Sequence, residues 1–330
     1  MPDLFKLTRK LVEIPSVTGH EHQIGEFLFR YLKDAGFTTD KQEVADGRFN
    51  VLAQSGPSLV TLSTHMDTVS PVIEFSEDGE FIYGRGACDA KGIIASQIKA
   101  AEKLLDEGIT GFGMLYVVGE ETESDGAHAA NTLETESRFL VNGEPTGNTL
   151  AMGSKGSINV DIIASGKAAH SACPEQGESA ILKLLNILHD LQKTAFPSDS
   201  LLGDTTMNIG MIEGGTQYNV IPDRAVARLK FRTVYDNELV KNVLESSVHG
   251  RAEIRYQFEC PPVRFEMLDG FETTVAAFTT DIPMLTGWGR PFLIGPGSIL
   301  DAHTDHEKIL KDDLVSAVDI YHDLVMRLLK

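Results

Sequence analysis

Hydrophobic and polar positions alternate with two different periods along the first half of the chain, and the alternation predicts an α/β fold. Apolar residues spaced three or four positions apart predict helices at residues 20–35 and 90–107. Short apolar runs rich in β-branched residues predict buried strands at residues 58–64, 111–118 and 138–142. Strands that alternate with helices favour a mostly parallel sheet covered by helices on both faces.

The pattern changes after Gly153. The elements predicted next are a strand, a helix, two strands, a helix and a strand, at residues 158–165, 177–191, 206–213, 224–233, 238–249 and 252–259. This βαββαβ order is the ferredoxin-like arrangement. We therefore expect a small α/β domain at residues 153–260, inserted into a first domain made of residues 1–152 and 261–330. The first domain resumes with a strand at residues 292–294 and a final helix at residues 312–329.

Composition narrows the classes of partner. The chain has 330 residues and a formal net charge of -19, so it repels phosphate groups and a nucleic-acid partner is not expected. No basic start followed by an apolar core opens the chain, and no apolar run is long enough to span a bilayer, so no membrane partner is expected. The three cysteines are far apart and form no CxxC motif, which fits a reducing compartment. We expect a cytoplasmic protein.

Polar residues follow several predicted strands at the point where each strand ends. His65 and Asp67 follow the first buried run, the pair Glu120 and Glu121 follows the second, and Glu144 follows the third. Asp89 comes where a glycine-rich loop runs into the second predicted helix, and His303 comes late in the chain. Because ligands of open parallel sheets bind at the carboxyl ends of the strands, we expect these side chains to converge at one edge of the sheet.

Imidazole and carboxylate groups together suit Zn²⁺, with Co²⁺ or Mn²⁺ as possible substitutes. Two metal ions about 3.5–4 Å apart need an anion between them, and Asp89 is the natural candidate. Neighbouring residues of extended chain point to opposite sides, so one of Glu120 and Glu121 should bind metal while the other acts as a general base. Each residue alone also has a simpler reading: Asp89 as a helix N-cap, His65 as a buried histidine, and the glutamate pair as a solvated loop.

At these residues the sequence resembles the dimerisation-domain zinc hydrolases, which include acetylornithine deacetylase, succinyl-diaminopimelate desuccinylase, aminoacylase and glutamate carboxypeptidase. The matching segments lie in the same order along the chain, at residues 63–69, 84–92, 120–121, 144–146 and 302–307. The resemblance extends over nearly the whole chain. It implies a zinc-exopeptidase-like catalytic domain and an inserted lid that also forms a homodimer.

The resemblance also implies a ligand set for two Zn²⁺ ions. Asp89 would bridge them, His65 and Glu144 would complete one ion, and Glu121 and His303 would complete the other. His306 lies three residues beyond His303 and is the alternative ligand, but the alanine before His303 matches the family motif.

Further roles follow from the same resemblance. Glu120 would be the general base, and Asp67 would accept a hydrogen bond from the ring of His65 and orient it. In the inserted domain His170 would help to hold the substrate carbonyl, and Asn219 and Arg232 would bind a substrate carboxylate.

The expected activity is removal of an acyl group, most simply acetyl, from an N-acyl amino acid of the acetylornithine or acetyllysine type. A dipeptidase or carboxypeptidase acting on a dipeptide is the alternative within the family. In the family that the chain resembles, a glutamate at the place of Glu144 accompanies deacylases and carboxypeptidases, whereas the aminopeptidase-type relatives carry aspartate there. Two other classes stay open: a metal-binding scaffold without catalysis and, ranked low, a thiol enzyme using Cys88, whose pKa the neighbouring Asp89 should raise.

Overall fold

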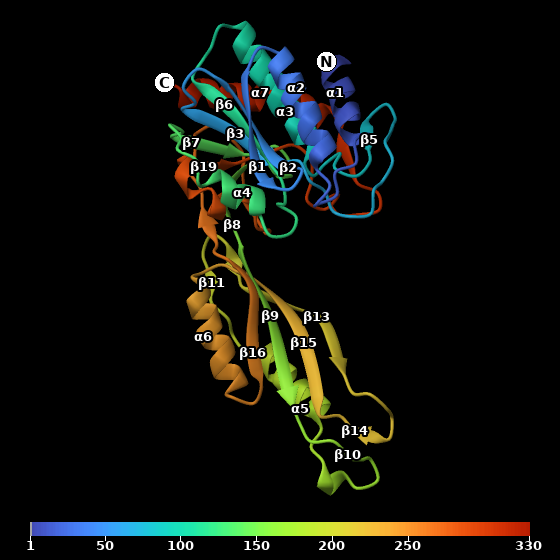
Figure 1. Ribbon diagram of the computed structural model, residues 1–330. Helices are drawn as coiled ribbons and strands as arrows, with labels where there is room; N and C mark the ends of the chain where they lie inside the picture. The colour runs from blue at the N-terminus through green and yellow to red at the C-terminus, as the bar shows by residue number, and fades with distance from the viewer. Residues whose placement is uncertain (1) are drawn as a thin grey trace. The chain divides into compact units, whose positions relative to one another are not determined.

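The computed structural model describes residues 2–330, and the chain divides into two compact units (Figure 1). Unit 1 contains the chain up to Met152 together with Phe265–Thr274 and Thr280–Lys330. Unit 2 contains Gly153–Arg264 and Val275–Thr279. Unit 2 is therefore inserted between two parts of unit 1. The predicted catalytic and lid roles of the two parts stay predictions at this point.

Unit 1 is built on a six-stranded sheet. Its strands lie in the order β1 (Thr38–Ala45), β2 (Arg48–Ser55), β6 (Phe112–Val117), β3 (Val60–His65), β7 (Phe139–Asn142) and β19 (Arg290–Leu293). The four strands β6, β3, β7 and β19 run parallel, whereas β2 pairs antiparallel with both β1 and β6. Every residue of β3 and β6 is buried, as expected for strands covered on both faces. The predicted α/β class is confirmed, with a mixed sheet.

Helices cover both faces of this sheet (Figure 1). The helices of unit 1 are α1 (Pro2–Val12), α2 (His22–Asp34), α3 (Lys91–Asp106), α4 (Asp125–Ala130) and α7 (Lys311–Leu328). Two neighbouring residues of β2 show the two faces, because neighbours on a strand point in opposite directions. The ring of Phe49 packs against Gly25 of α2, while the side-chain amide of Asn50 donates a hydrogen bond of 2.8 Å to the carbonyl of Gly126 in α4.

The remaining elements are short. A three-stranded sheet in unit 1 consists of β20 (Lys308–Leu310), β5 (Phe81–Tyr83) and β4 (Ser76–Glu77). Another consists of β17 (Val263–Arg264), β8 (Leu150–Ser154) and β18 (Thr273–Ala276). Single 3-10 turns lie at Pro174–Gln176, Ile282–Met284 and Thr286–Trp288. Among residues 2–330, no helix is both long and apolar enough to cross a membrane.

Unit 2 has the predicted ferredoxin-like order. Its main elements are β9 (Gly156–Ser165), α5 (Ala180–Lys193), β13 (Thr206–Gly214), β15 (Arg224–Thr233), α6 (Asn237–Val248) and β16 (Glu253–Cys260). The four strands form an antiparallel sheet in the order β13-β15-β9-β16, and α5 and α6 pack against it around a separate hydrophobic core. Two short pairs are added: β10 (Ala169–His170) with β14 (Val220–Ile221), and β11 (Ser198–Asp199) with β12 (Gly203–Asp204).

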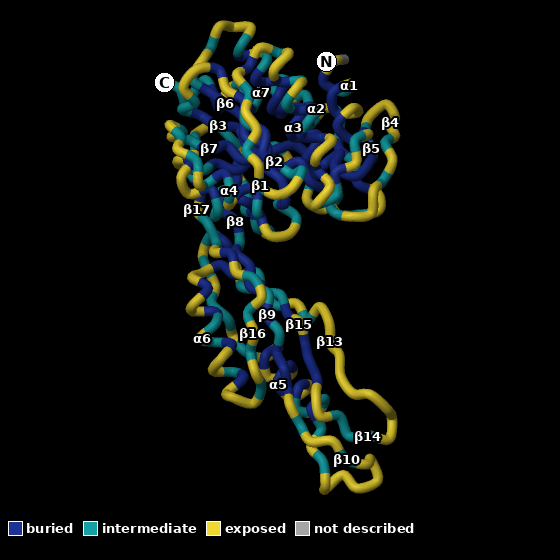
Figure 2. The backbone as a smooth tube through the Cα atoms, viewed as in Figure 1, coloured by how far each residue is buried: buried dark blue, intermediate teal, exposed yellow. Residues whose placement is uncertain are grey.

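The edge strand β13 is unusually open. Figure 2 shows it exposed along most of its length, whereas the neighbouring strand β15 is largely buried. The exposed residues include Met211 and Ile212, and the adjoining helix α5 exposes Leu182 and Leu185. One side of unit 2 therefore combines an unpaired strand edge with apolar side chains.

Candidate metal centre

The side chains at the carboxyl ends of the parallel strands come together in unit 1. His65 is the last residue of β3, and its Nε2 atom lies 3.0 Å from Oδ1 of Asp89. The other carboxylate oxygen of Asp89 lies 3.4 Å from Nε2 of His303. Asp89 thus lies between two histidines that are 238 positions apart in sequence order, from residue 65 to residue 303.

The histidine on the exposed side also contacts a glutamate. Nε2 of His303 lies 2.9 Å from the carboxylate of Glu121, and the His303 side chain is half exposed. His303 has a φ of 60°, a left-handed conformation that is uncommon for a residue other than glycine. Such conformations persist where the surrounding structure holds them, and they are concentrated at functional sites.

Two groups of three donors share one residue. The first group is His65, Asp89 and Glu144, all buried, and the second is Asp89, Glu121 and His303. Within each group one ligand atom from every residue lies within 4.8 Å of the others. The arrangement has the form expected of a two-metal site with a shared carboxylate. His306 belongs to neither group among the described residues.

The electrostatics of the site favour a bound cation. Burial raises the pKa of Glu120 and of Glu144 well above the usual value, and burial also raises that of Glu121. Oε1 of Glu144 is buried and accepts no hydrogen bond from the described residues. Crowded, buried carboxylates of this kind need a positive partner, so the donor chemistry fits divalent metal ions.

Asp89 and His303 behave as an ion pair when no metal is bound. Burial acts to raise the pKa of Asp89, but hydrogen bonds from His303 and His65 hold it below its usual value. Hydrogen bonds to Asp89 and Glu121 raise the pKa of His303 to about 10. The positive charge on His303 therefore balances the carboxylates of Asp89 and Glu121, which a bound metal cation would otherwise balance.

Glu120 and Glu121 lie in a turn after β6, not in extended chain as the strand argument assumed. Glu121 belongs to a donor group and Glu120 to neither. The carboxylate of Asp67 holds the turn, because Oδ1 accepts the backbone N–H of Glu120 at 3.1 Å and Oδ2 accepts that of Glu121 at 3.2 Å. Nδ1 of His65 lies 3.0 Å from the backbone carbonyl of Asp67 and 3.5 Å from Oδ1.

Glu307 is a contributor that sequence reasoning did not single out. One of its oxygens accepts the backbone N–H groups of Cys88 and Asp89 at 3.1 Å each, and the other accepts a 2.7 Å hydrogen bond from Arg85. This buried ion pair fixes the backbone at the shared carboxylate. The signal was present in the segment 302–307, but a partner about 218 positions away becomes visible only in the fold.

Asp281 is a second residue that affects the site and that the sequence did not predict. It is buried at the start of a 3-10 turn, and burial raises its pKa to about 7, a shift opposed by Ser124 and by the charge of His65. Its influence extends to the site, because its charge also raises the pKa of Glu120. A lone aspartate in a loop carries no sequence signal for such a position.

The predicted residues of unit 2 are not all brought together. His170 and Asn219 are neighbours: His170 pairs with Val220, and the backbone N–H of Ser171 donates to the carbonyl of Asn219 at 2.9 Å. Arg232 lies near the far end of β15, eight positions past Arg224, which is roughly 26 Å at 3.3 Å per residue. Arg232 pairs with Ser157, which comes shortly after Gly153, the first residue of unit 2. Arg232 therefore lies at the end of the sheet where the chain enters the unit. His170 and Asn219 are exposed, and Arg232 is half-buried.

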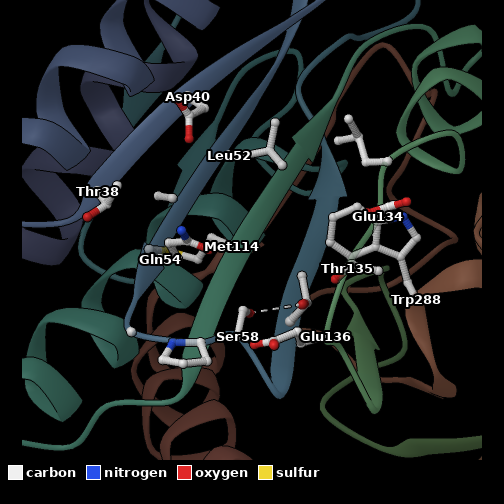
Figure 3. A pocket seen from close by; sticks show the side chains of 15 residues that line it. Thr38, Asp40, Leu52, Gln54, Ser58, Met114, Glu134, Thr135, Glu136 and Trp288 are labelled. Carbon is white, nitrogen blue, oxygen red and sulfur yellow. Dashed lines mark hydrogen bonds between the residues drawn. The ribbon is translucent and has the colours of Figure 1, made fainter.

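Two other features of unit 1 lie apart from the donor groups. Cys88 is buried, and burial and the charge of Asp89 raise its pKa well above the usual value, which disfavours a reactive thiolate. A cavity of about 430 Å³ is lined by residues that include Leu52, Gln54 and Trp288 (Figure 3). None of the predicted site residues lines this cavity.

Comparison with known proteins finds relatives along almost the whole chain. Residues 152–249 match the family model described as a peptidase dimerisation domain. The chain is 37% identical to a peptidase M20 domain-containing protein of Schizosaccharomyces pombe, over 98% of this chain and 84% of that protein. It is 33% identical to a probable carboxypeptidase of Aspergillus clavatus, over 99% of this chain and 89% of that protein.

Solved structures share the fold. The YXEP protein of Bacillus subtilis, described as a dinuclear metal binding peptidase from the M20 family, superposes with a TM-score of 0.72 and 18% identity. The alignment covers 98% of this chain and 96% of that one. At this identity the likeness concerns the fold alone, while the more similar relatives carry the assignment to a family.

Proposed function

Since the chain belongs to the M20 family of metallopeptidases, which are dinuclear metal enzymes that hydrolyse peptide or amide bonds, we propose that it cleaves the amide bond of an N-acyl amino acid with a free carboxylate. One observation carries the proposal. Two donor groups share Asp89, and a further buried glutamate, Glu120, lies beside them without belonging to either.

The proposed ligands are those of the two donor groups: His65, Asp89 and Glu144 for one ion, and Asp89, Glu121 and His303 for the other. The mixed imidazole and carboxylate set suits Zn²⁺, with Co²⁺ or Mn²⁺ as substitutes. When bound, such a pair of ions supplies Lewis acidity that makes water a nucleophile near neutral pH and polarises an amide carbonyl.

Glu120 is the proposed general base. Burial above all, and then the charges of the surrounding carboxylates, raise its pKa well above the usual value, as suits a group that must both accept and return a proton. We propose that it takes a proton from the attacking water and then delivers that proton to the leaving nitrogen. Asp67 supports this role by holding the backbone of the Glu120–Glu121 turn.

The substrate carboxylate is assigned to Arg232 and Asn219, and the developing oxyanion to His170. Within one chain, Arg232 lies beside the start of β9, whereas His170 and Asn219 lie at the small β10-β14 pair, beyond the end of β9. A small substrate cannot reach both places. We propose that one chain contributes Arg232 and a second copy contributes His170 and Asn219, so that the enzyme acts as a homodimer.

The open edge of unit 2 supports this assembly. The strand β13 leaves its outer hydrogen-bonding edge unpaired, and α5 places the exposed Leu182 and Leu185 beside it. A long unpaired edge is normally protected in a stable protein. Pairing with the same edge of a second copy would complete the hydrogen bonds of both strands and bury the apolar side chains.

Two substrate classes fit this chemistry. Removal of an acetyl group, as from acetylornithine or acetyllysine, is favoured because the Gly295-Pro296-Gly297 segment before His303 resembles that of the acetylornithine-type deacetylases. Release of a C-terminal amino acid from a dipeptide is favoured by the relative described as a probable carboxypeptidase. Both classes require an amide bond next to an α-carboxylate, and they differ in the acyl side.

The test is a substrate panel with matched pairs. N-acetyl amino acids and the corresponding glycyl dipeptides are assayed with Zn²⁺, Co²⁺ or Mn²⁺, and each is compared with its carboxamide. We expect hydrolysis to need metal and to fall at least about 100-fold when the carboxylate is replaced by the carboxamide. Equal rates on both forms would remove the carboxylate from the proposal. A metal-free protein, inactive throughout and unaffected by chelator, would instead favour a scaffold.

A further inference from the structure

A short segment near the N-terminus is joined to the loop that carries Asp67. The backbone N–H of Thr68 donates to the carbonyl of Ser16 at 2.9 Å, and the N–H of Thr18 donates to the carbonyl of Thr68 at 3.1 Å. Val17 and Thr68 form an isolated parallel bridge. The segment therefore runs alongside the chain immediately after Asp67.

The side chain of Thr18 extends this connection to the carboxylate itself. Its hydroxyl donates to Oδ2 of Asp67 at 2.7 Å. The same carboxylate accepts the backbone N–H groups of Glu120 and Glu121. A chain of hydrogen bonds thus runs from Thr18 through Asp67 to the turn that carries the proposed base and one proposed ligand.

The same segment is also anchored from the other side of the site. Lys91 is buried and donates from Nζ to the carbonyl of Ile14 at 2.7 Å. Lys91 begins α3, two positions after Asp89. The residues from Ile14 to Thr18 therefore contact both the loop of Asp67 and the start of helix α3, two positions after the candidate ligand Asp89.

The hydroxyl of Thr18 has a specific geometric task. Asp67 is fully buried, so its carboxylate needs donors with fixed directions, and hydrogen bonds to a charged group are stronger and shorter than neutral ones. Without the hydroxyl, Oδ2 would keep the N–H of Glu121 but lose the donor that sets the rotation of the carboxylate. A rotated carboxylate would move both N–H groups of the turn together.

We propose that Thr18 is a positioning residue, which orients Asp67 and through it sets the placement of Glu120 and Glu121. The inference rests on the proposed function for its effect on turnover. Its effect on metal affinity can be measured independently, because Glu121 belongs to a donor group whether or not the preferred substrate is known.

The test compares side chains with and without the hydroxyl. Thr18→Val and Thr18→Ala remove it, Thr18→Ser keeps it, and Thr132→Val removes a hydroxyl that donates a comparable 2.7 Å bond to Ala129 away from the site. For Thr18→Val and Thr18→Ala we expect a 10–100-fold loss of kcat with KM within about twofold, and Co²⁺ affinity about tenfold weaker by calorimetry. Thr18→Ser and Thr132→Val should stay within about twofold of wild type in both readouts.

The outcomes separate the alternatives. If Thr18→Ser is as impaired as Thr18→Val, the methyl group and its packing matter, and the proposal is wrong. If Thr18→Val and Thr18→Ala match Thr132→Val in both kcat and Co²⁺ affinity, the hydroxyl has no positioning role. If wild type hydrolyses nothing in the panel, the proposed function fails, while the Co²⁺ affinities still decide the role of Thr18.

Discussion

In unit 1 the candidate ligands lie close together and three of them are buried, whereas in unit 2 the predicted substrate-binding residues lie on two different sheets, toward opposite ends of the unit. His65, Asp89 and Glu144 are held by strand ends and by buried hydrogen bonds within a single unit. His170 is exposed on the two-residue strand β10. Arg232 lies on β15, eight positions past Arg224, the first residue of that strand. A metal site needs ligands that one fold holds in fixed positions, while residues that bind a substrate can come from two copies of the chain.

The largest expected effect tests the candidate metal centre of unit 1. Glu120→Gln removes the proposed base but keeps its shape, so kcat should fall about 1000-fold, within the range typical of general acid–base groups. Metal content by elemental analysis should stay normal, because Glu120 lies outside both donor groups. Glu123→Gln changes an exposed residue of the same turn and is the matched control. Turnover of Glu120→Gln at the level of that control would end the assignment.

The next prediction tests whether two chains share a site. Arg232→Ala and His170→Ala should each lower kcat/KM about 100-fold as homodimers, because each removes one polar contact to the substrate. If the two residues act from different chains, mixing the variants under exchange creates dimers with one intact site. Equal mixing should then restore about a quarter of wild-type sites. No recovery on mixing, with exchange verified by mass, would mean that the residues act within one chain.

A smaller effect is expected from changing the apolar edge. Leu182→Glu puts a charge on the exposed side of α5 and should shift the protein from dimer to monomer in sedimentation. Turnover should fall with the dimer fraction, while metal content should not change. Leu239→Glu introduces the same charge at an exposed position of α6 and should leave the dimer intact. A wild-type protein that is monomeric at assay concentration would contradict the two-chain site directly.

The last prediction concerns the pH dependence of metal affinity. Hydrogen bonds to Asp89 and Glu121 raise the pKa of His303 to about 10 from an ordinary 6.5. In the metal-free protein this ion pair stabilises the fold fully below pH 6.5, and the stabilisation is lost as pH rises through about 10. Because a metal requires the unprotonated ring, affinity should rise with pH between these values, up to about tenfold per unit for each proton displaced. Calorimetry in buffers of different ionisation enthalpy counts those protons, and a pH-independent affinity would contradict the prediction.

The sequence predicted the features that depend on local pattern. The buried runs at β3, β6 and β7 are mostly apolar or β-branched, so both the strands and the polar residues after them could be found. The pair β1 and β2 was not predicted, since β1 is largely exposed and reads as a polar segment. No helix was predicted at Pro2–Val12 either.

The parts of the site that the sequence did not predict depend on contacts between residues far apart in the chain. Glu307 and Thr18 act on backbone groups of Asp89 and on Asp67, and no local spacing links such partners. The separation of Arg232 from His170 follows from strand pairing, since Arg232 pairs with Ser157 near the start of β9, whereas His170 lies after the end of β9 and pairs with Val220 in a separate two-stranded sheet. A sequence motif indicates which residue types are present, whereas the pairing of strands in the fold determines which of those residues lie close together.

The insertion of unit 2 has a consequence for the order in which the chain acquires its structure. The strand β19 and the helix α7 complete the unit 1 sheet and its helical cover, yet they follow unit 2 in the chain. During synthesis from the N-terminus, the segment Gly153–Arg264 emerges whole before β7 receives its neighbour β19. His303 and Glu307 arrive later still. A nascent chain therefore cannot assemble the shared-carboxylate site until residues 303–307 have left the ribosome, and stalling before that point should leave a folded insert on an unfinished sheet.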